Sequence, residues 1–190
     1  MNKTTARIIV TLQCNRDCDY CVNKQPGILD QAIPLTSIFQ LRGYTEICLT
    51  GGEPLLLDGA VLENFINMLY TYYPIQAVYL YTSYAPTVGK LSHIIDIISG
   101  ITFTLHSDID LLELGNFYRL QADLYNRPGG SHRLKIHEGI TTAISIIPSV
   151  WRDIQLFNPQ QVCQVPEHED LYIMTPGYLR SLGYKESELP

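Results

Sequence analysis

The sequence ARIIVTLQCNRDCDYC occupies residues 6–21 and joins a strand-like run to a loop with three cysteines. The run Ala6–Gln13 is apolar and rich in β-branched residues, which predicts a buried strand. Cys14, Cys18 and Cys21 follow it directly. Three thiols placed where a strand ends predict a site for a metal or for catalysis.

A second stretch, TEICLTGGEP at residues 45–54, repeats this arrangement of a strand followed by a special turn. Its first six residues predict a strand, and a Gly-Gly-Glu-Pro turn follows. The two glycines are interpreted as letting the backbone come close to a ligand. Further strands are expected at residues 75–83, 101–107 and 133–139, within 141–159 and at 171–174. Helices are expected at residues 34–44, after Asp58, at residues 87–99, after Asp108 or Asp110, and at residues 175–184.

Strands that alternate with helices predict an α/β fold with parallel strands and right-handed crossovers. A complete eight-unit barrel needs about 250 residues, and this chain has 190. We therefore expect an incomplete (β/α)5-6 barrel, a curved and mostly parallel sheet with helices outside. Residues 1–190 are expected to form one domain, in which residues 126–190 shape the substrate pocket. Both special turns then lie on one rim, because ligands sit at the carboxyl ends of parallel strands.

The composition of the chain argues against a nucleic-acid-binding protein, a membrane-spanning protein and a disulfide-stabilised protein. The formal net charge is −6, which does not favour nucleic acid as a partner. No apolar run approaches the roughly 18 residues needed to span a membrane, and the first residues lack the architecture of a signal peptide. The chain is therefore expected to be cytoplasmic. An odd number of cysteines, five, argues against a disulfide framework and for metal binding or catalysis.

The three clustered thiols leave two kinds of metal site open. A structural zinc site needs four ligands, so Cys48, Cys163 or a histidine would have to complete it. Cys48 lies within a predicted strand, where a small buried core residue is expected. The other possibility is a four-iron cluster held by three thiolates, which leaves one iron open to an outside ligand.

The Cys-x3-Cys-x2-Cys spacing, the aromatic Tyr20 before the last cysteine and the GGEP turn together resemble the radical S-adenosylmethionine (SAM) superfamily. The resemblance covers about the first 110 residues. It implies that Cys14, Cys18 and Cys21 hold a [4Fe-4S] cluster whose open iron binds SAM. The same resemblance implies cofactor-binding roles for Tyr20, Gly51, Gly52, Glu53, Pro54, Thr82, Ser83, His106 and Ser107, with Lys135 and His137 matched by position only.

The resemblance also implies a reaction. A flavodoxin- or ferredoxin-type reductant loads one electron onto the cluster, and SAM is cleaved to methionine and a 5′-deoxyadenosyl radical. That radical then abstracts hydrogen from a small-molecule or nucleotide substrate. The protein positions the reactants and excludes water. Structural roles stay open for Glu53 as a helix-start acid, for Thr82 and Ser83 as loop hydroxyls, and for His106.

Alternatives remain within and outside the superfamily. Cys48 and Cys163 are too few for an auxiliary cluster, which favours the compact members. The sequence CDYCVNK resembles the loop of enzymes that activate glycyl-radical enzymes. Val22-Asn23 departs from the Asp-Thr that usually follows the third cysteine in 7-carboxy-7-deazaguanine synthases. A zinc-binding interaction module is the alternative from a different class.

Overall fold

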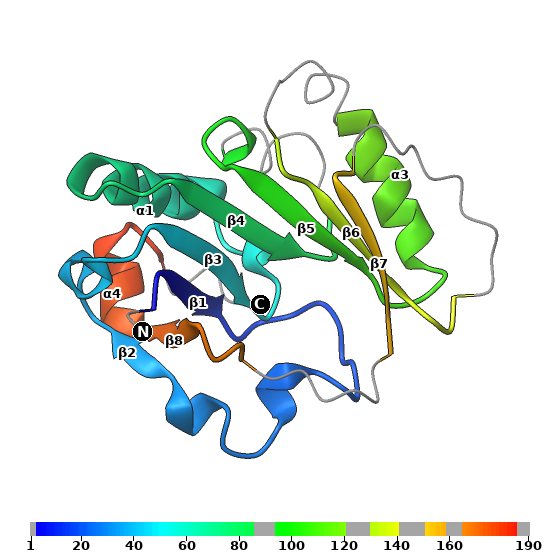
Figure 1. The fold of residues 1–190 in the computed structure, drawn as a ribbon, viewed down its shortest axis with the longest axis horizontal. Helices are drawn as coiled ribbons and strands as arrows, with labels where there is room; N and C mark the ends of the chain where they lie inside the picture. Colours follow the sequence, from blue (N-terminus) through cyan, green and yellow to red (C-terminus); the bar gives the residue numbers. More distant parts are fainter. Residues whose placement is uncertain (1–2, 86–93, 121–129, 141–150, 159–164, 186–190) are drawn as a thin grey trace.

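The sheet of this protein has eight strands, all parallel, in the order β2-β8-β1-β3-β4-β5-β6-β7 (Figure 1). The computed structural model describes residues 3–85, 94–120, 130–140, 151–158 and 165–185. The expected α/β class and the open, curved sheet are confirmed. The strands are β1 Thr5–Thr11, β2 Ile33–Leu35, β3 Glu46–Gly51, β4 Ala77–Thr82, β5 Gly100–Leu105, β6 Arg133–His137, β7 Asp153–Phe157 and β8 Glu169–Met174.

Six of these strands follow one another across the sheet in chain order, from β1 through β3 to β7. This part matches the expected incomplete barrel of five or six units. The other two strands extend the sheet beyond β1, because β8 pairs with β1 and the short β2 pairs with β8. Because β8 pairs with β1, β1 lies inside the sheet and not at its edge. This pairing between distant parts of the chain was not predicted from the sequence.

The helices lie against one face of the sheet and bury the apolar positions of alternate strand residues. Helix α1 begins after Asp58, whose side chain accepts a hydrogen bond from the Ala60 N–H at 2.9 Å, as the sequence predicts for an N-cap. Phe65 of α1 and Phe117 of α3 are both fully buried in the core. The α-helices are α1 Gly59–Tyr72, α3 Asp110–Leu120 and α4 Pro176–Ser181, and the 3-10 helices are η1 Val22–Lys24, η2 Leu29–Gln31, η3 Ile38–Leu41 and η4 Pro54–Leu56.

The helix expected over residues 34–44 was wrong. Pro34 instead lies in β2, where it pairs with Ile173 of β8 at the edge of the sheet, a place that tolerates a residue without an N–H. Ser37 is extended and caps only the four-residue 3-10 helix η3. Gly43, with φ of +101°, ends the segment as expected for its residue type. The first residues of the predicted helix thus pair with β8, and only residues 38–41 are helical.

Some of the remaining predicted elements lie within the described residues, and others lie outside them. The strand at residues 133–139 corresponds to β6, the strands within 141–159 and at 171–174 to β7 and β8, and the last helix to α4. Most of the helix expected over residues 87–99 lies outside the described residues, as does Cys163. Within the part of the chain that is described, no helix is both long and apolar enough to cross a membrane.

Candidate functional site

The cysteine loop and the Gly-Gly-Glu-Pro turn are joined directly by backbone hydrogen bonds. The Gly52 N–H donates to the Thr11 carbonyl at 2.7 Å, and the Glu53 N–H donates to the Gln13 carbonyl at 2.7 Å. Gln13 immediately precedes Cys14, so the first cysteine leaves the sheet beside this turn. The expectation that the two segments share one rim of the parallel sheet is therefore confirmed.

The two glycines are required by this contact between segments of the chain. A Cβ atom on Gly52 would lie 1.9 Å from the Gln13 carbonyl oxygen, and one on Gly51 would lie 2.3 Å from the Thr11 oxygen. Gly51 also has a φ of +128°, which side chains rarely adopt. The close approach interpreted from the sequence as one to a ligand is thus made by the strand that leads into the cysteine loop.

The three cysteines form a partly exposed group of free thiols at the rim. Cys14 is exposed, and Cys18 and Cys21 are half-buried and linked by a hydrogen bond from the Cys21 N–H to the Cys18 carbonyl at 3.2 Å. Burial, followed by the charge of neighbouring thiols and acids, raises the pKa of Cys14 and Cys18. Arg16 acts in the opposite direction on both pKa values.

The thiols are close enough to influence one another, yet they do not surround a single point. Among the described residues, no three His, Cys, Asp or Glu side chains are arranged to hold one metal ion. A zinc ion needs ligands that converge on one centre, whereas a four-iron cluster takes each cysteine at a different iron. Cys48, 5% exposed within β3, is a core residue as expected.

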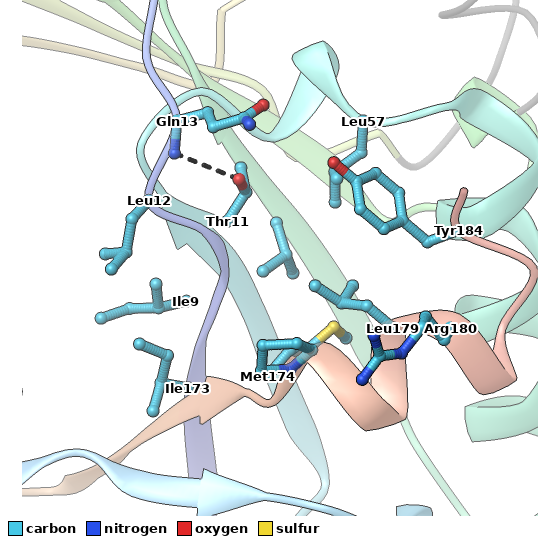
Figure 2. A pocket seen from close by; sticks show the side chains of 12 residues that line it. Ile9, Thr11, Leu12, Gln13, Leu57, Ile173, Met174, Leu179, Arg180 and Tyr184 are labelled. Carbon is cyan, nitrogen blue, oxygen red and sulfur yellow. Dashed lines mark hydrogen bonds between the residues drawn. The ribbon is translucent and has the colours of Figure 1, made fainter. Parts of the chain in front are cut away.

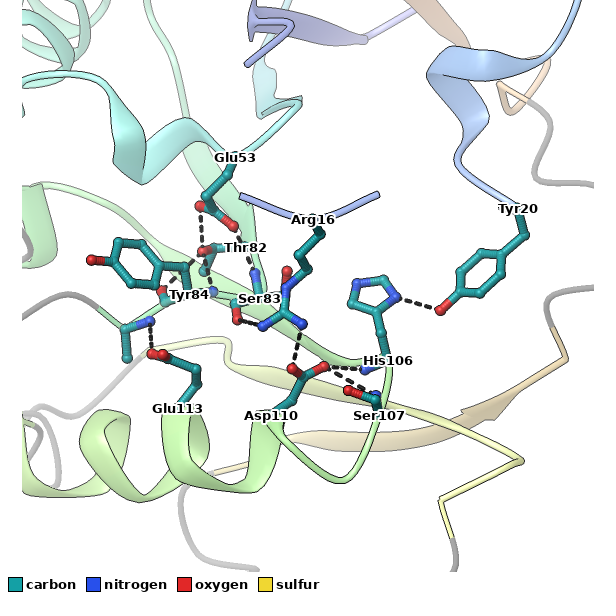
Figure 3. Close-up of polar contacts among 11 residues, drawn as sticks. Arg16, Tyr20, Glu53, Thr82, Ser83, Tyr84, His106, Ser107, Asp110 and Glu113 are labelled. Atoms are coloured by element: carbon teal, nitrogen blue, oxygen red, sulfur yellow. Dashed lines mark hydrogen bonds and ion pairs between the residues drawn. The ribbon is translucent and has the colours of Figure 1, made fainter. Parts of the chain in front are cut away.

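Glu53 of the turn is a buried acid, 1% exposed, whose contacts in this structure are with the protein (Figure 3). It accepts hydrogen bonds from the Thr82 hydroxyl at 2.6 Å, the Ser83 N–H at 3.0 Å and the Leu55 N–H at 3.1 Å. Burial raises the pKa of Glu53, and these hydrogen bonds together with the charge of Arg16 act against that rise. Glu53 thereby ties the turn to the end of β4.

Arg16 and Asp110 are two site residues that the sequence analysis did not assign to the site. Arg16 lies between the first two cysteines and reaches from the loop to the ends of two strands (Figure 3). Its guanidinium forms an ion pair with Asp110 and donates to the Ser83 carbonyl at 3.0 Å. Asp110 is fully buried and also accepts from the His106 N–H at 2.6 Å and the Ser107 N–H at 3.1 Å. The only signal in the sequence was a single basic residue inside the cysteine motif.

Tyr20 brings the far end of the cysteine loop to the end of β5. Its hydroxyl lies 2.7 Å from His106 Nδ1. Burial lowers the pKa of His106 to about 4, so the ring is neutral at pH 7, and its Nδ1 forms a hydrogen bond with the Tyr20 hydroxyl. The rings of His137 and Phe157 lie 5.6 and 6.2 Å from the Tyr20 ring. The residue matched only by position, His137, therefore lies in the same ring group as Tyr20 and His106.

The other predicted site residues lie along the same edge of the sheet. Thr82 ends β4, and Ser83 follows it, both buried against Glu53. Ser107 belongs to the turn between β5 and α3 that Asp110 holds. Pro54 starts η4 and is buried. Lys135, at the register position of Gln155, lies two residues before His137 and so on the same face of β6.

A mostly apolar pocket of about 340 Å³ opens on the other side of the β1 terminus, between β8 and α4 (Figure 2). Its lining includes Leu12, Gln13, Met174, Leu179 and Tyr184. It reaches Gln13, next to Cys14, but none of the three cysteines lines it. The pocket and the polar rim are therefore neighbouring features with different chemistry.

Comparison with known proteins identifies relatives over part of the chain. It is 37% identical over 75 residues to the GTP 3′,8-cyclase of Helicobacter pylori, a match covering 35% of this chain and 23% of that relative. The GTP 3′,8-cyclases of a Sulfurovum species and of Sulfurimonas denitrificans are each 35% identical over 77 residues, 36% of this chain and 23% of theirs. These relatives are radical SAM enzymes. Over this stretch the chain is similar to radical SAM enzymes.

The match is partial, because the aligned part spans less than a quarter of the length of these relatives. No family model matches the chain, and no solved structure matches it either. The relatives, as radical SAM enzymes, use a [4Fe-4S] cluster and SAM. The nucleotide-cyclase name of the relatives does not favour the alternative of an activating protein for glycyl-radical enzymes.

The residues at the rim fit these two cofactors chemically. Thiolates are the ligands that iron–sulfur clusters use, and three of them leave an iron for SAM. Arg16 Nε is buried and has no hydrogen-bond partner among the described residues. Because buried donors are normally paired, an anionic group bound beside the loop would satisfy it. The amino-acid part of SAM carries such a group, its carboxylate.

Proposed function

We propose that this protein binds a [4Fe-4S] cluster through Cys14, Cys18 and Cys21, and cleaves SAM reductively to act on a nucleotide or another small molecule. When bound and reduced, the cluster supplies one electron to SAM, which yields methionine and a 5′-deoxyadenosyl radical that abstracts hydrogen from the substrate. The electron comes from a reductant of the flavodoxin or ferredoxin type. The single observation that carries the proposal is the direct junction of the cysteine loop with the Gly-Gly-Glu-Pro turn.

The turn and the strand ends have separate tasks in this proposal. Gly51, Gly52 and Pro54 present backbone groups beside the loop, where the methionine part of SAM binds. Glu53 keeps that backbone in place through its hydrogen bonds to Thr82 and the Ser83 N–H, which are short and buried. A carboxylate with three protein donors orders the site before a ligand arrives, and such order lowers the cost of binding.

The ring group at the ends of β5, β6 and β7 is where we place the adenosine of SAM and the substrate. Tyr20, His106, His137 and Phe157 are half-buried, and their ring centroids lie 5.5 to 6.2 Å from their neighbours. Flat apolar rings with polar edges suit a nucleobase, which stacks on aromatic side chains. The name GTP 3′,8-cyclase of the relatives supports a nucleotide substrate.

The test is the formation of 5′-deoxyadenosine by anaerobically reconstituted protein. Iron, sulfide, SAM and dithionite should give a brown protein and 5′-deoxyadenosine. Cys14→Ala, Cys18→Ala and Cys21→Ala should each abolish both, because each removes one of only three ligands. Iron content, visible absorption and product chromatography measure the three outcomes.

The matched control is Cys48→Ala, a cysteine that is buried in β3. This variant should keep its cluster and its cleavage activity. A cluster lost from Cys48→Ala, or kept by all three loop variants, would contradict the ligand assignment. A colourless wild-type protein that takes up zinc instead would favour the zinc-binding module.

A further inference from the structure

We propose that Arg16 and Asp110 act as one positioning pair, which clamps the cysteine loop to the turn between β5 and α3 and so fixes the cluster relative to the SAM site. The inference rests on the proposed function, because it takes Cys14, Cys18 and Cys21 as the cluster ligands. Neither residue touches a reacting atom in this assignment. Their ion pair holds other groups in place, and it leaves Arg16 Nε for the SAM carboxylate.

The geometry of the loop supports a clamp. Arg16 lies between Cys14 and Cys18, and its guanidinium is engaged by two separate segments, Asp110 of α3 and the Ser83 carbonyl after β4. Ser83 in turn donates its N–H to Glu53 of the Gly-Gly-Glu-Pro turn. One side chain inside the cluster motif is therefore connected to the ends of β4 and β5 and, through Ser83, to the Gly-Gly-Glu-Pro turn.

Asp110 organises the other half of the clamp. Its carboxylate is fully buried and accepts the backbone N–H groups of His106 and Ser107 in addition to its ion pair with Arg16. His106 meets Tyr20, which lies beyond Cys18 in the loop. The loop is thus attached on both sides of Cys18 to a single turn, residues 106–110. A displacement of that turn would move Cys18 and the adenosine side of the site together.

The burial of the pair makes it more than a surface ion pair. The side chain of Arg16 is 17% exposed and that of Asp110 is 0% exposed. Removal of either charge leaves the other buried without its partner, which is a costly state. The loop also carries an exposed ion pair, Lys24 with Asp17, whose side chains are 45% and 95% exposed. Exposed pairs of this kind contribute little, so Lys24 provides a matched control.

The experiment compares Arg16→Gln, Asp110→Asn, the double variant and Lys24→Ala. In the metal-free proteins, hydrogen exchange of residues 14–24 should be faster in both single variants and unchanged in Lys24→Ala. In the reconstituted proteins, iron loss to an excess of chelator should be about 10- to 100-fold faster in the single variants, the usual effect of removing an outer partner of a metal ligand. The double variant should be no worse than the single ones, because the two residues act as a unit.

Two further readouts separate positioning from general loss of structure. The change that SAM causes in the electron paramagnetic resonance spectrum of the reduced cluster should be weakened in Arg16→Gln. Arg16→Lys, which keeps the charge but loses the planar fork, should restore it in part. Thermal unfolding of the metal-free proteins identifies any variant that fails to fold, and Arg16→Lys then carries the comparison.

Each outcome has a distinct meaning. Unchanged hydrogen exchange in Arg16→Gln would overturn the clamp, whatever the metal does. Faster exchange with wild-type iron loss and a wild-type response to SAM would overturn its link to the cluster. Failure of the wild-type protein to take up iron and sulfide would instead overturn the proposed function, while the exchange data would still decide whether the pair holds the loop.

Discussion

His106 shows how one residue couples the cysteine loop to the pH of the solution. Burial, the largest influence, lowers its pKa from 6.5 to about 4; the charge of Asp110 acts against this shift, and Arg16 and His137 add to it. The neutral ring can then accept the Tyr20 hydroxyl at Nδ1. A protonated ring has no acceptor there, so protonation of His106 forces the Tyr20 hydroxyl to accept in place of donating and puts a charge in a largely buried position.

The sign of the resulting pH dependence follows from the two pKa values. Between pH 6.5 and about 4 the unfolded chain binds a proton that the folded chain does not. The free energy of unfolding of the metal-free protein should therefore fall as the pH falls through this window, and this contribution should be constant above it. His106→Asn should flatten that slope. Urea unfolding of both proteins across the window measures the difference, and parallel curves would contradict the role of His106.

At the scale of elements, the junction between β1 and β3 depends on residues without side chains. Gly52→Ala would place a Cβ atom 1.9 Å from the Gln13 carbonyl oxygen, which is backbone and cannot rotate away. We expect a loss of about 1–3 kcal/mol in the free energy of unfolding, the usual cost of forcing atoms into a packed place. The loop would separate from the turn, and iron uptake on reconstitution should fall as well.

Gly177 of α4 is the control for that change, because a Cβ atom there meets nothing within 4 Å. Gly177→Ala should leave iron uptake unchanged and stabilise the protein by up to about 1 kcal/mol, since alanine loses less backbone freedom in a helix. Urea unfolding and iron analysis compare the stability and the iron uptake of Gly52→Ala with those of Gly177→Ala. Equal effects of the two substitutions would show that the junction does not depend on close approach at Gly52.

The sequence predicted the central strands of the sheet better than the strand at its edge. The strands β1, β3, β4 and β5 are buried or half-buried at every position, and each carries several large apolar residues that mark it as a strand in the sequence. The edges behave differently. β2 has three residues, one of them Pro34, and pairs only with β8. The conformation of β2 depends on β8, which lies more than 130 residues later in the chain. The residues of β2 alone therefore do not reveal this pairing.

The same division applies to the site. The cysteine motif and the Gly-Gly-Glu-Pro turn are local patterns, and both were found from the sequence. The ion pair of Arg16 with Asp110 joins a loop to a distant helix, and its members look like ordinary polar residues in the sequence. The close packing of Gly51 on Thr11 and of Gly52 on Gln13 was not predicted for a related reason, because these contacts join segments about 40 residues apart in the chain.

At the scale of the whole molecule, β8 closes the side of the sheet next to β1 with a buried ion pair. Arg7 of β1 forms two contacts with Glu169 of β8, Nε to Oε2 at 2.5 Å and Nη2 to Oε1 at 3.1 Å. Its guanidinium also lies 4.6 Å from the centroid of the Tyr81 ring. Burial would lower the pKa of Arg7, but Glu169 and Tyr81 outweigh it and raise that pKa above its ordinary value. The guanidinium is therefore charged, and it connects three strands on the face of the sheet opposite the helices.

Substitutions of this ion pair measure how much it contributes to the attachment of β8 to β1. Glu169→Ala leaves the buried guanidinium of Arg7 without its partner, so the free energy of unfolding should fall by about 3–5 kcal/mol. The double variant Arg7→Met with Glu169→Leu replaces both charges by apolar groups and should cost clearly less, because no charge remains to be desolvated. Urea unfolding of the wild type, Arg7→Met, Glu169→Leu and the double variant gives the coupling energy. A double variant as unstable as the sum of its single changes would mean that β8 is held by its backbone pairing with β1 alone.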